Sequence, residues 1–103
     1  MINFDLKDIP FLLKNHNKQI EFSHHAIKKM EDHGLTKNCI LNCMKSSKLL
    51  GILKQDTNKF KLYYTYPSGN NYDLVVIIGI HNPHMIIRIV TIFKQISRRR
   101  ERL

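Results

Sequence analysis

Residues 72–81 form a nearly continuous run of apolar side chains, and this run constrains the fold more than any other feature. Turn-forming residues at positions 67–71 and 82–84 limit it to the length of a strand. Half-buried strands alternate apolar with polar residues, whereas a strand that is covered on both faces does not. We therefore expect residues 72–81 to be an interior strand that is buried on both faces.

Three further segments are expected to be strands, namely residues 49–55, 60–66 and 85–94. Residues 60–66 alternate in side-chain character, and residues 85–94 are rich in isoleucine and valine, which favour strands. Turn chemistry at residues 56–58 separates the first two of these segments. Because consecutive strands joined by short turns pair as neighbours, the sequence predicts a four-stranded antiparallel meander.

Two helices are expected before these strands. Ser23 is a favourable N-cap residue, and the helix that it begins runs to about His33, where Gly34 provides a C-cap. Thr36 caps a second helix that frays near residues 46–47.

The first part of the chain is less regular. Residues 5–14 are expected to form a short helix, and residues 19–22 a short extended piece. We therefore expect a single α+β domain over residues 1–103, with N-terminal helices packed on one face of a four-stranded antiparallel sheet. Residues 1–18 are its N-terminal extension, and residues 95–103 are a basic tail.

The chain is strongly basic. Lysine and arginine total 17 against 8 acidic residues, for a formal net charge of +9. Such an excess attracts phosphate backbones and releases their counterions, so RNA is the expected partner. The alternatives are a role in solubility alone or an acidic partner protein.

Other classes of protein are not expected. The sequence has no apolar run of transmembrane length and no signal-peptide pattern at its N-terminus, so no membrane association is expected. Cys39 and Cys43 stand one helical turn apart, which does not resemble a disulfide framework. These features predict a cytoplasmic protein.

The helix that begins at Ser23 carries the main candidate site. His25, Lys29 and His33 are spaced four residues apart, which places them on one side of the helix, beside its apolar stripe. Metal-independent RNA cleavage needs a base, an acid and cations, and histidine titrates near neutral pH. The alternatives are a solvated basic helix face, or a zinc site that lacks a carboxylate to complete it. No metal or cofactor is expected.

Further cations and aromatic side chains extend this site. Arg88 interrupts an apolar strand and is expected to share a face with Val90, Ile92 and Lys94, so that Arg88 and Lys94 complete a cationic site with the helix. Tyr63 alternates with lysine and is the tyrosine expected to stack an RNA base. The other residues expected to contact RNA are basic or imidazole side chains on the helix and in the tail, namely His24, Lys28, Arg98 and Arg99.

Residues 25–36 resemble a signature of the RelE-like toxin superfamily, H-A-x-x-R-M-x-x-R-G-[IVL]-[ST]. A later segment, residues 89–93, is similar to the V-x-T-[VI]-[YF] strand of those families, and the resemblance covers roughly residues 20–95. Lys29 and His33 stand where the signature has arginines. The resemblance implies a RelE/barnase-like fold, metal-independent RNA cleavage and an acidic antitoxin partner that covers the site.

The functional expectation is therefore a RelE-like toxin or endoribonuclease that cleaves RNA through attack of the 2′-hydroxyl. In that scheme His25, or His24 in its place, and His33 transfer protons, while Lys29 and Arg88 stabilise charge. The alternative is a non-catalytic nucleic-acid-binding module, or an antitoxin-binding domain, on the same scaffold.

Overall fold

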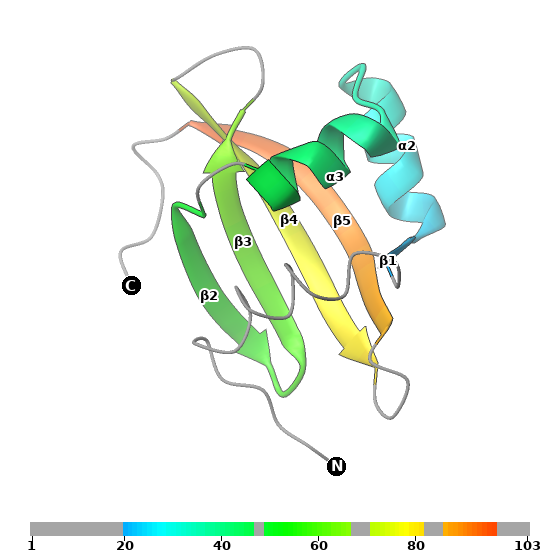
Figure 1. Ribbon diagram of the computed structural model, residues 1–103, viewed down its shortest axis with the longest axis vertical. Coiled ribbons are helices and arrows are strands. Elements are labelled where there is room, and N and C mark those ends of the chain that lie inside the picture. Colours follow the sequence, from blue (N-terminus) through cyan, green and yellow to red (C-terminus); the bar gives the residue numbers. More distant parts are fainter. Residues whose placement is uncertain (1–19, 47–48, 67–70, 82–85, 97–103) are drawn as a thin grey trace.

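The computed structural model describes residues 20–46, 49–66, 71–81 and 86–96, and these build one mixed sheet with two helices (Figure 1). The sheet has five strands in the order β1-β5-β4-β3-β2. Their bounds are β1 Ile20–Phe22, β2 Gly51–Asp56, β3 Lys59–Thr65, β4 Tyr72–His81 and β5 Ile86–Ile96.

The apolar run at residues 72–81 is the middle strand, β4. Leu74, Val75 and Val76 are consecutive in β4, and each has no exposed surface. Because consecutive strand residues point to opposite faces, β4 is covered on both faces of the sheet. The prediction of an interior strand is confirmed.

The expectation of four antiparallel strands is wrong. Strands β2 to β5 do pair antiparallel with their neighbours, but β1 adds a fifth strand that pairs parallel to β5 through Ile20–Ile87 and Phe22–Ile89. The two helices follow β1 in the chain, so they do not precede the whole sheet. The short extended piece expected at residues 19–22 is this strand, β1. Its place in the sheet was not predicted, because three residues show no periodic pattern and a parallel partner lies far away in sequence.

Both helices begin where their capping residues predict, and the first also ends where Gly34 predicts. Helix α2 spans His24–Asp32, and the backbone N–H of Ala26 donates to Ser23 Oγ at 3.0 Å. Gly34 follows the helix with φ +66°, a left-handed conformation that glycine adopts without strain. Helix α3 spans Lys37–Ser46, and the backbone N–H of Cys39 donates to Thr36 Oγ1 at 3.1 Å. Neither of these two described helices is long and apolar enough to cross a membrane.

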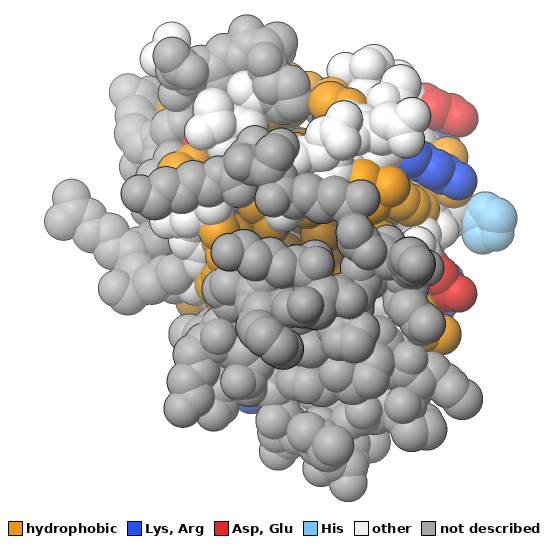
Figure 2. Space-filling model, viewed as in Figure 1, with side chains coloured by type: hydrophobic (Ala, Val, Ile, Leu, Met, Phe, Trp, Pro, Cys, Tyr) orange, Lys and Arg blue, Asp and Glu red, His pale blue; other side chains and the backbone are white. Residues whose placement is uncertain are grey.

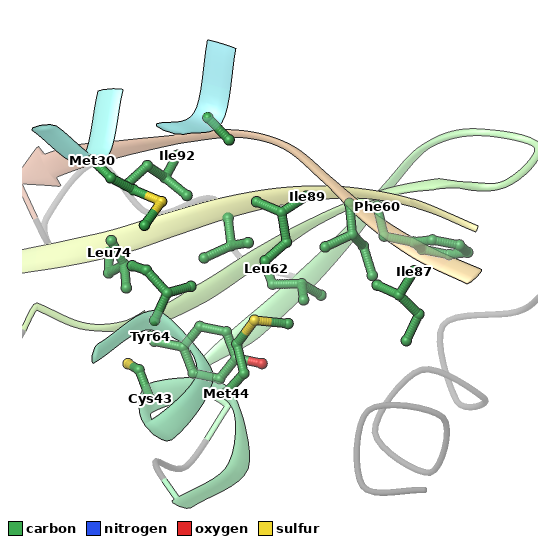
Figure 3. Close-up of a cluster of buried hydrophobic side chains, with 14 of the residues drawn as sticks. Met30, Cys43, Met44, Phe60, Leu62, Tyr64, Leu74, Ile87, Ile89 and Ile92 are labelled. Atoms are coloured by element: carbon green, nitrogen blue, oxygen red, sulfur yellow. The ribbon is translucent and has the colours of Figure 1, made fainter. Parts of the chain in front are cut away.

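One hydrophobic core lies between these helices and one face of the sheet (Figure 3). Helix α2 contributes Ala26 and Met30, and helix α3 contributes Ile40, Cys43 and Met44. The sheet residues of this core that Figure 3 labels are Phe60, Leu62, Tyr64, Leu74, Ile87, Ile89 and Ile92. The face of the sheet that bears these residues is called the helix face below. The opposite face, which bears Lys61, Tyr63 and Arg88, is called the open-strand face.

A β-bulge in β5 changes which residues reach each face. Ile77 of β4 pairs with Thr91, whereas the next residue, Ile78, pairs with Ile89. Val90 is therefore an extra residue without a partner on β4. As a result, odd-numbered residues of β5 reach the helix face before the bulge, and even-numbered residues reach it afterwards.

Some expected elements lie outside the described residues. These are the N-terminal extension with its short helix at residues 5–14, the turn at residues 82–84 and most of the basic tail. The tail was expected to begin at Gln95, but β5 continues through Ile96.

The first prediction concerns Ser23, whose hydroxyl caps α2 and also donates to the Val90 carbonyl of β5 at 2.6 Å. Ser23→Ala removes both interactions, so we expect it to lower the free energy of unfolding by about 2 kcal/mol. Thr36→Ala is the matched control, because that exposed hydroxyl makes only the cap bond at Cys39, and it should cost about 1 kcal/mol. Urea unfolding measures both values, and equal losses would contradict the anchoring role of Ser23.

The second prediction concerns Tyr64, which lies beneath α3. Burial raises the pKa of Tyr64, because desolvation disfavours the phenolate, and a nearby Cys43 thiolate adds to the effect. Its buried hydroxyl has no hydrogen-bond partner among the residues that the structure describes. The neutral form is favoured in the folded state, so this contribution to stability is complete below about pH 10 and is lost as the pH rises above it.

We therefore expect the free energy of unfolding to fall above pH 10, by up to about 1.4 kcal/mol per pH unit for this group. Tyr64→Phe should make that fall shallower, and at pH 7 it should leave stability unchanged or raised, because it removes an unpaired buried hydroxyl. Urea unfolding between pH 8 and pH 11 tests this. Identical pH profiles for the two proteins would refute it.

Candidate nucleic-acid interface

Helix α2 presents its predicted site residues along one edge of the molecule. Its buried residues Ala26 and Met30 pack on the sheet, whereas His25 and His33 are exposed and Lys29 is half-buried. His33 is the C-cap residue, so the three side chains follow one side of the helix over its full length. The helix does place these three residues in a row at the rim of its packing face.

The charge along this edge is mixed. His24 and Lys28 are exposed on α2, and so are the acidic residues Glu31 and Asp32. Figure 2 shows basic, histidine and acidic side chains close together at the edge over α2. This edge is therefore not a uniformly positive surface.

Arg88 does not join the α2 residues. It lies between Ile87 and Ile89, which both belong to the hydrophobic core on the helix face, so its exposed side chain points to the open-strand face. Its partners in the neighbouring strands are Glu21 and Gly79. The sheet therefore separates Arg88 from His25, Lys29 and His33.

The grouping of Arg88 with Lys94 is also corrected by the structure. Strict alternation would place residues 88, 90, 92 and 94 on one face, but the extra residue Val90 interrupts it. Lys94 pairs with Leu74, a core residue, and therefore lies on the helix face. Arg88 and Lys94 thus lie on opposite faces of the sheet.

Lys94 lies instead between two tyrosines at the end of the sheet. Its Nζ is 4.2 Å from the ring centroid of Tyr72 and 4.9 Å from that of Tyr66. An ammonium group at such distances is attracted by the negative faces of aromatic rings. We call these three residues the Lys94–tyrosine cluster.

The two tyrosines of the cluster differ in exposure. Tyr66 is buried, and desolvation raises the pKa of its hydroxyl, with a smaller contribution from Cys39 of α3. Tyr72 is 38 % exposed. Tyr66 is therefore the buried side of the cluster, whereas the ring of Tyr72 is accessible to solvent.

Tyr63 occupies a different environment from the one expected of a stacking residue. It has no exposed surface, and its buried hydroxyl has no hydrogen-bond partner in the described part of the chain. Lys61 lies over its ring at 5.4 Å and over that of Phe93 at 5.6 Å, on the open-strand face. A nucleobase therefore cannot stack on the ring of Tyr63. The tyrosine that is both exposed and next to a lysine is Tyr72. Alternation identified the face of Tyr63 but could not show that this part of the face is covered.

The remaining expected residues give no further grouping. Arg98 and Arg99 lie outside the described residues. Across residues 20–46, 49–66, 71–81 and 86–96, no three histidine, cysteine or acidic residues are close enough together to hold a metal ion. Cys39 and Cys43 form no disulfide among the described residues, and Cys43 Sγ lies 3.8 Å from the Thr65 carbonyl oxygen.

The signature that suggested RelE-like toxins has a structural explanation in this chain. Ala26 and Met30 are the core residues of α2, Gly34 takes a left-handed conformation after it, and Thr36 caps α3. Any capped pair of helices on a sheet favours such residues at these spacings. The pattern therefore reports the turn between two helices and does not identify a superfamily.

Comparison with known proteins replaces the RelE assignment. No curated protein and no solved structure gives a significant match to this chain. The model of the MJ0788 family matches residues 9–78, which is more than half of the chain and includes both helices and strands β1 to β3. The resemblance to RelE-like toxins, with its RelE/barnase-like fold, was therefore wrong, and the chain belongs to the MJ0788 family.

Proposed function

We propose that this protein is a non-catalytic nucleic-acid-binding module whose partner is RNA. The observation that carries the proposal is the formal net charge of +9 on 103 residues. Attraction to a phosphate backbone and release of its counterions are what such a charge favours. Exposed Lys28, Lys59, Arg88 and Lys94 lie on α2 and on both faces of the sheet, which suits contacts to an extended backbone.

The spacing of the histidines supports binding over cleavage. His33 follows His25 by eight positions, which corresponds to a rise of about 12 Å along the helix axis. Proton transfer in catalysis requires each group to lie within about 3 Å of the atom that it protonates or deprotonates. Two groups this far apart, with Arg88 on the other face of the sheet, are poorly arranged around a single phosphate.

RNA cleavage by 2′-hydroxyl attack is the second candidate, because His25, Lys29 and His33 share one side of α2. RNA incubated with the protein in the presence of EDTA separates the two functions, since metal-dependent nucleases are then inactive. We expect the RNA to remain intact. Products formed by the wild type and absent with a His25→Ala/His33→Ala double variant would establish cleavage in place of simple binding.

RNA binding that depends on the net positive charge should weaken as the salt concentration rises. Fluorescence anisotropy with a labelled single-stranded oligoribonucleotide should give a linear fall of log K with log salt, with a slope of about −0.7 for each phosphate contacted. Four to six contacts correspond to a slope of about −3 to −4. No binding at low salt, or displacement of the RNA by an acidic peptide of equal charge, would instead favour a protein partner.

The proposed compartment is the cytoplasm. Cys39 is half-buried and Cys43 is buried, and the two form no disulfide within the described residues, which suits a reducing environment.

A further inference from the structure

Four lysines in the described part of the chain lie over aromatic rings, but their rings differ in access to solvent. Lys54 lies over Phe60 and Lys61 over Tyr63, and neither of these rings has exposed surface. Lys37 lies over the half-buried Phe22, and Lys61 also lies over the half-buried Phe93. Of the aromatic residues in this part of the chain, Tyr72 alone is exposed. The distance from Lys94 Nζ to the centroid of its ring is 4.2 Å, the shortest of these lysine–ring distances.

We propose that the Lys94–tyrosine cluster binds single-stranded RNA, with a base stacked on Tyr72 and the adjacent phosphate bound by Lys94. The proposal rests on the RNA-binding function proposed above and specifies both the form of RNA and the residues that recognise it. Exposed aromatic rings beside a positive charge are the recurring means by which proteins bind unpaired nucleotides.

The backbone holds the cluster in place. The backbone N–H of Tyr66, at the end of β3, donates to the Tyr72 carbonyl at the start of β4 at 3.1 Å. The two rings are thus carried by residues that are bonded to each other, and Lys94 of β5 lies over both. A site held on strands in this way needs little reordering when a ligand binds, which favours affinity.

Each residue of the cluster has a separate role. Tyr66 is buried and completes the site from inside, so it offers no stacking surface. Tyr72 is 38 % exposed and provides the stacking surface. The Lys94 side chain is exposed, and its ammonium group has three N–H donors, which can serve a phosphate oxygen while it lies over the two rings.

Stacking on Tyr72 requires a base whose face is free. In a duplex the faces of the bases are covered by their neighbours, whereas single strands can turn bases outward. Stacking of one base changes affinity by about 5- to 100-fold when the aromatic ring is removed. The cluster should therefore confer a preference for single-stranded over duplex RNA, and that preference should depend on the ring of Tyr72.

The test compares binding of a fluorescent ten-nucleotide oligouridine with binding of a duplex of the same length, by anisotropy at low salt. Tyr72→Ala should weaken oligouridine binding by at least about 5-fold and change duplex binding by less than about 2-fold. Tyr72→Phe keeps the ring and should bind as the wild type does. Lys94→Gln should weaken binding of both RNAs, and more than Lys61→Gln, the matched control on the open-strand face that also lies over two rings.

Tyrosine fluorescence gives a second readout, because the chain has four tyrosines and no tryptophan. Oligouridine should quench the wild type, and Tyr72→Phe should remove most of the quenching while it preserves binding. Salt-sensitive RNA binding by the wild type that Tyr72→Ala leaves unchanged, or weakens equally for both RNAs, would overturn this inference and leave the proposed function standing. Failure of the wild type to bind either RNA would overturn both.

Discussion

The contact between Ser23 and the bulge in β5 is the interaction on which the rest of the structure depends. The Ser23 hydroxyl accepts a hydrogen bond from the Ala26 N–H in the first turn of α2 and donates one to the Val90 carbonyl. The Ser23 backbone N–H donates to the Ile89 carbonyl, which continues the pairing of β1 with β5. One residue therefore ends the parallel strand, begins the helix and fixes both beside the bulge.

The bulge in turn decides how the cations are distributed. Without the extra residue Val90, alternation would bring Arg88 and Lys94 to the same side of the sheet. With it, Arg88 points away from the helices, whereas Lys94 lies over the rings of Tyr66 and Tyr72 on the helix face. The arrangement favours dispersed phosphate contacts plus one aromatic site, and disfavours a single cleft of catalytic side chains.

Local signals in the sequence predicted the local structure well, because capping and turn residues act over a few positions. Ser23, Gly34 and Thr36 marked the helix ends, and the apolar run marked the interior strand. Two long-range features could not be predicted in this way. The parallel pairing of β1 with β5 has no local signal, because a three-residue strand shows no periodic pattern of side chains. The bulge at Val90 has no local signal either, because no glycine marks it. The same signals also produced the mistaken RelE resemblance, because capping and packing residues recur in unrelated folds.

The proposed RNA site lies at the end of the sheet, where Lys94 lies between Tyr66 and Tyr72. The most direct measurement is a titration of ¹⁵N-labelled protein with oligouridine, followed by amide chemical shifts. If RNA binds at this site, the largest changes in amide chemical shift should occur at Tyr72, Lys94 and their strand neighbours. Largest changes around Arg88 and Lys59 on the open-strand face, or no changes at all, would contradict it.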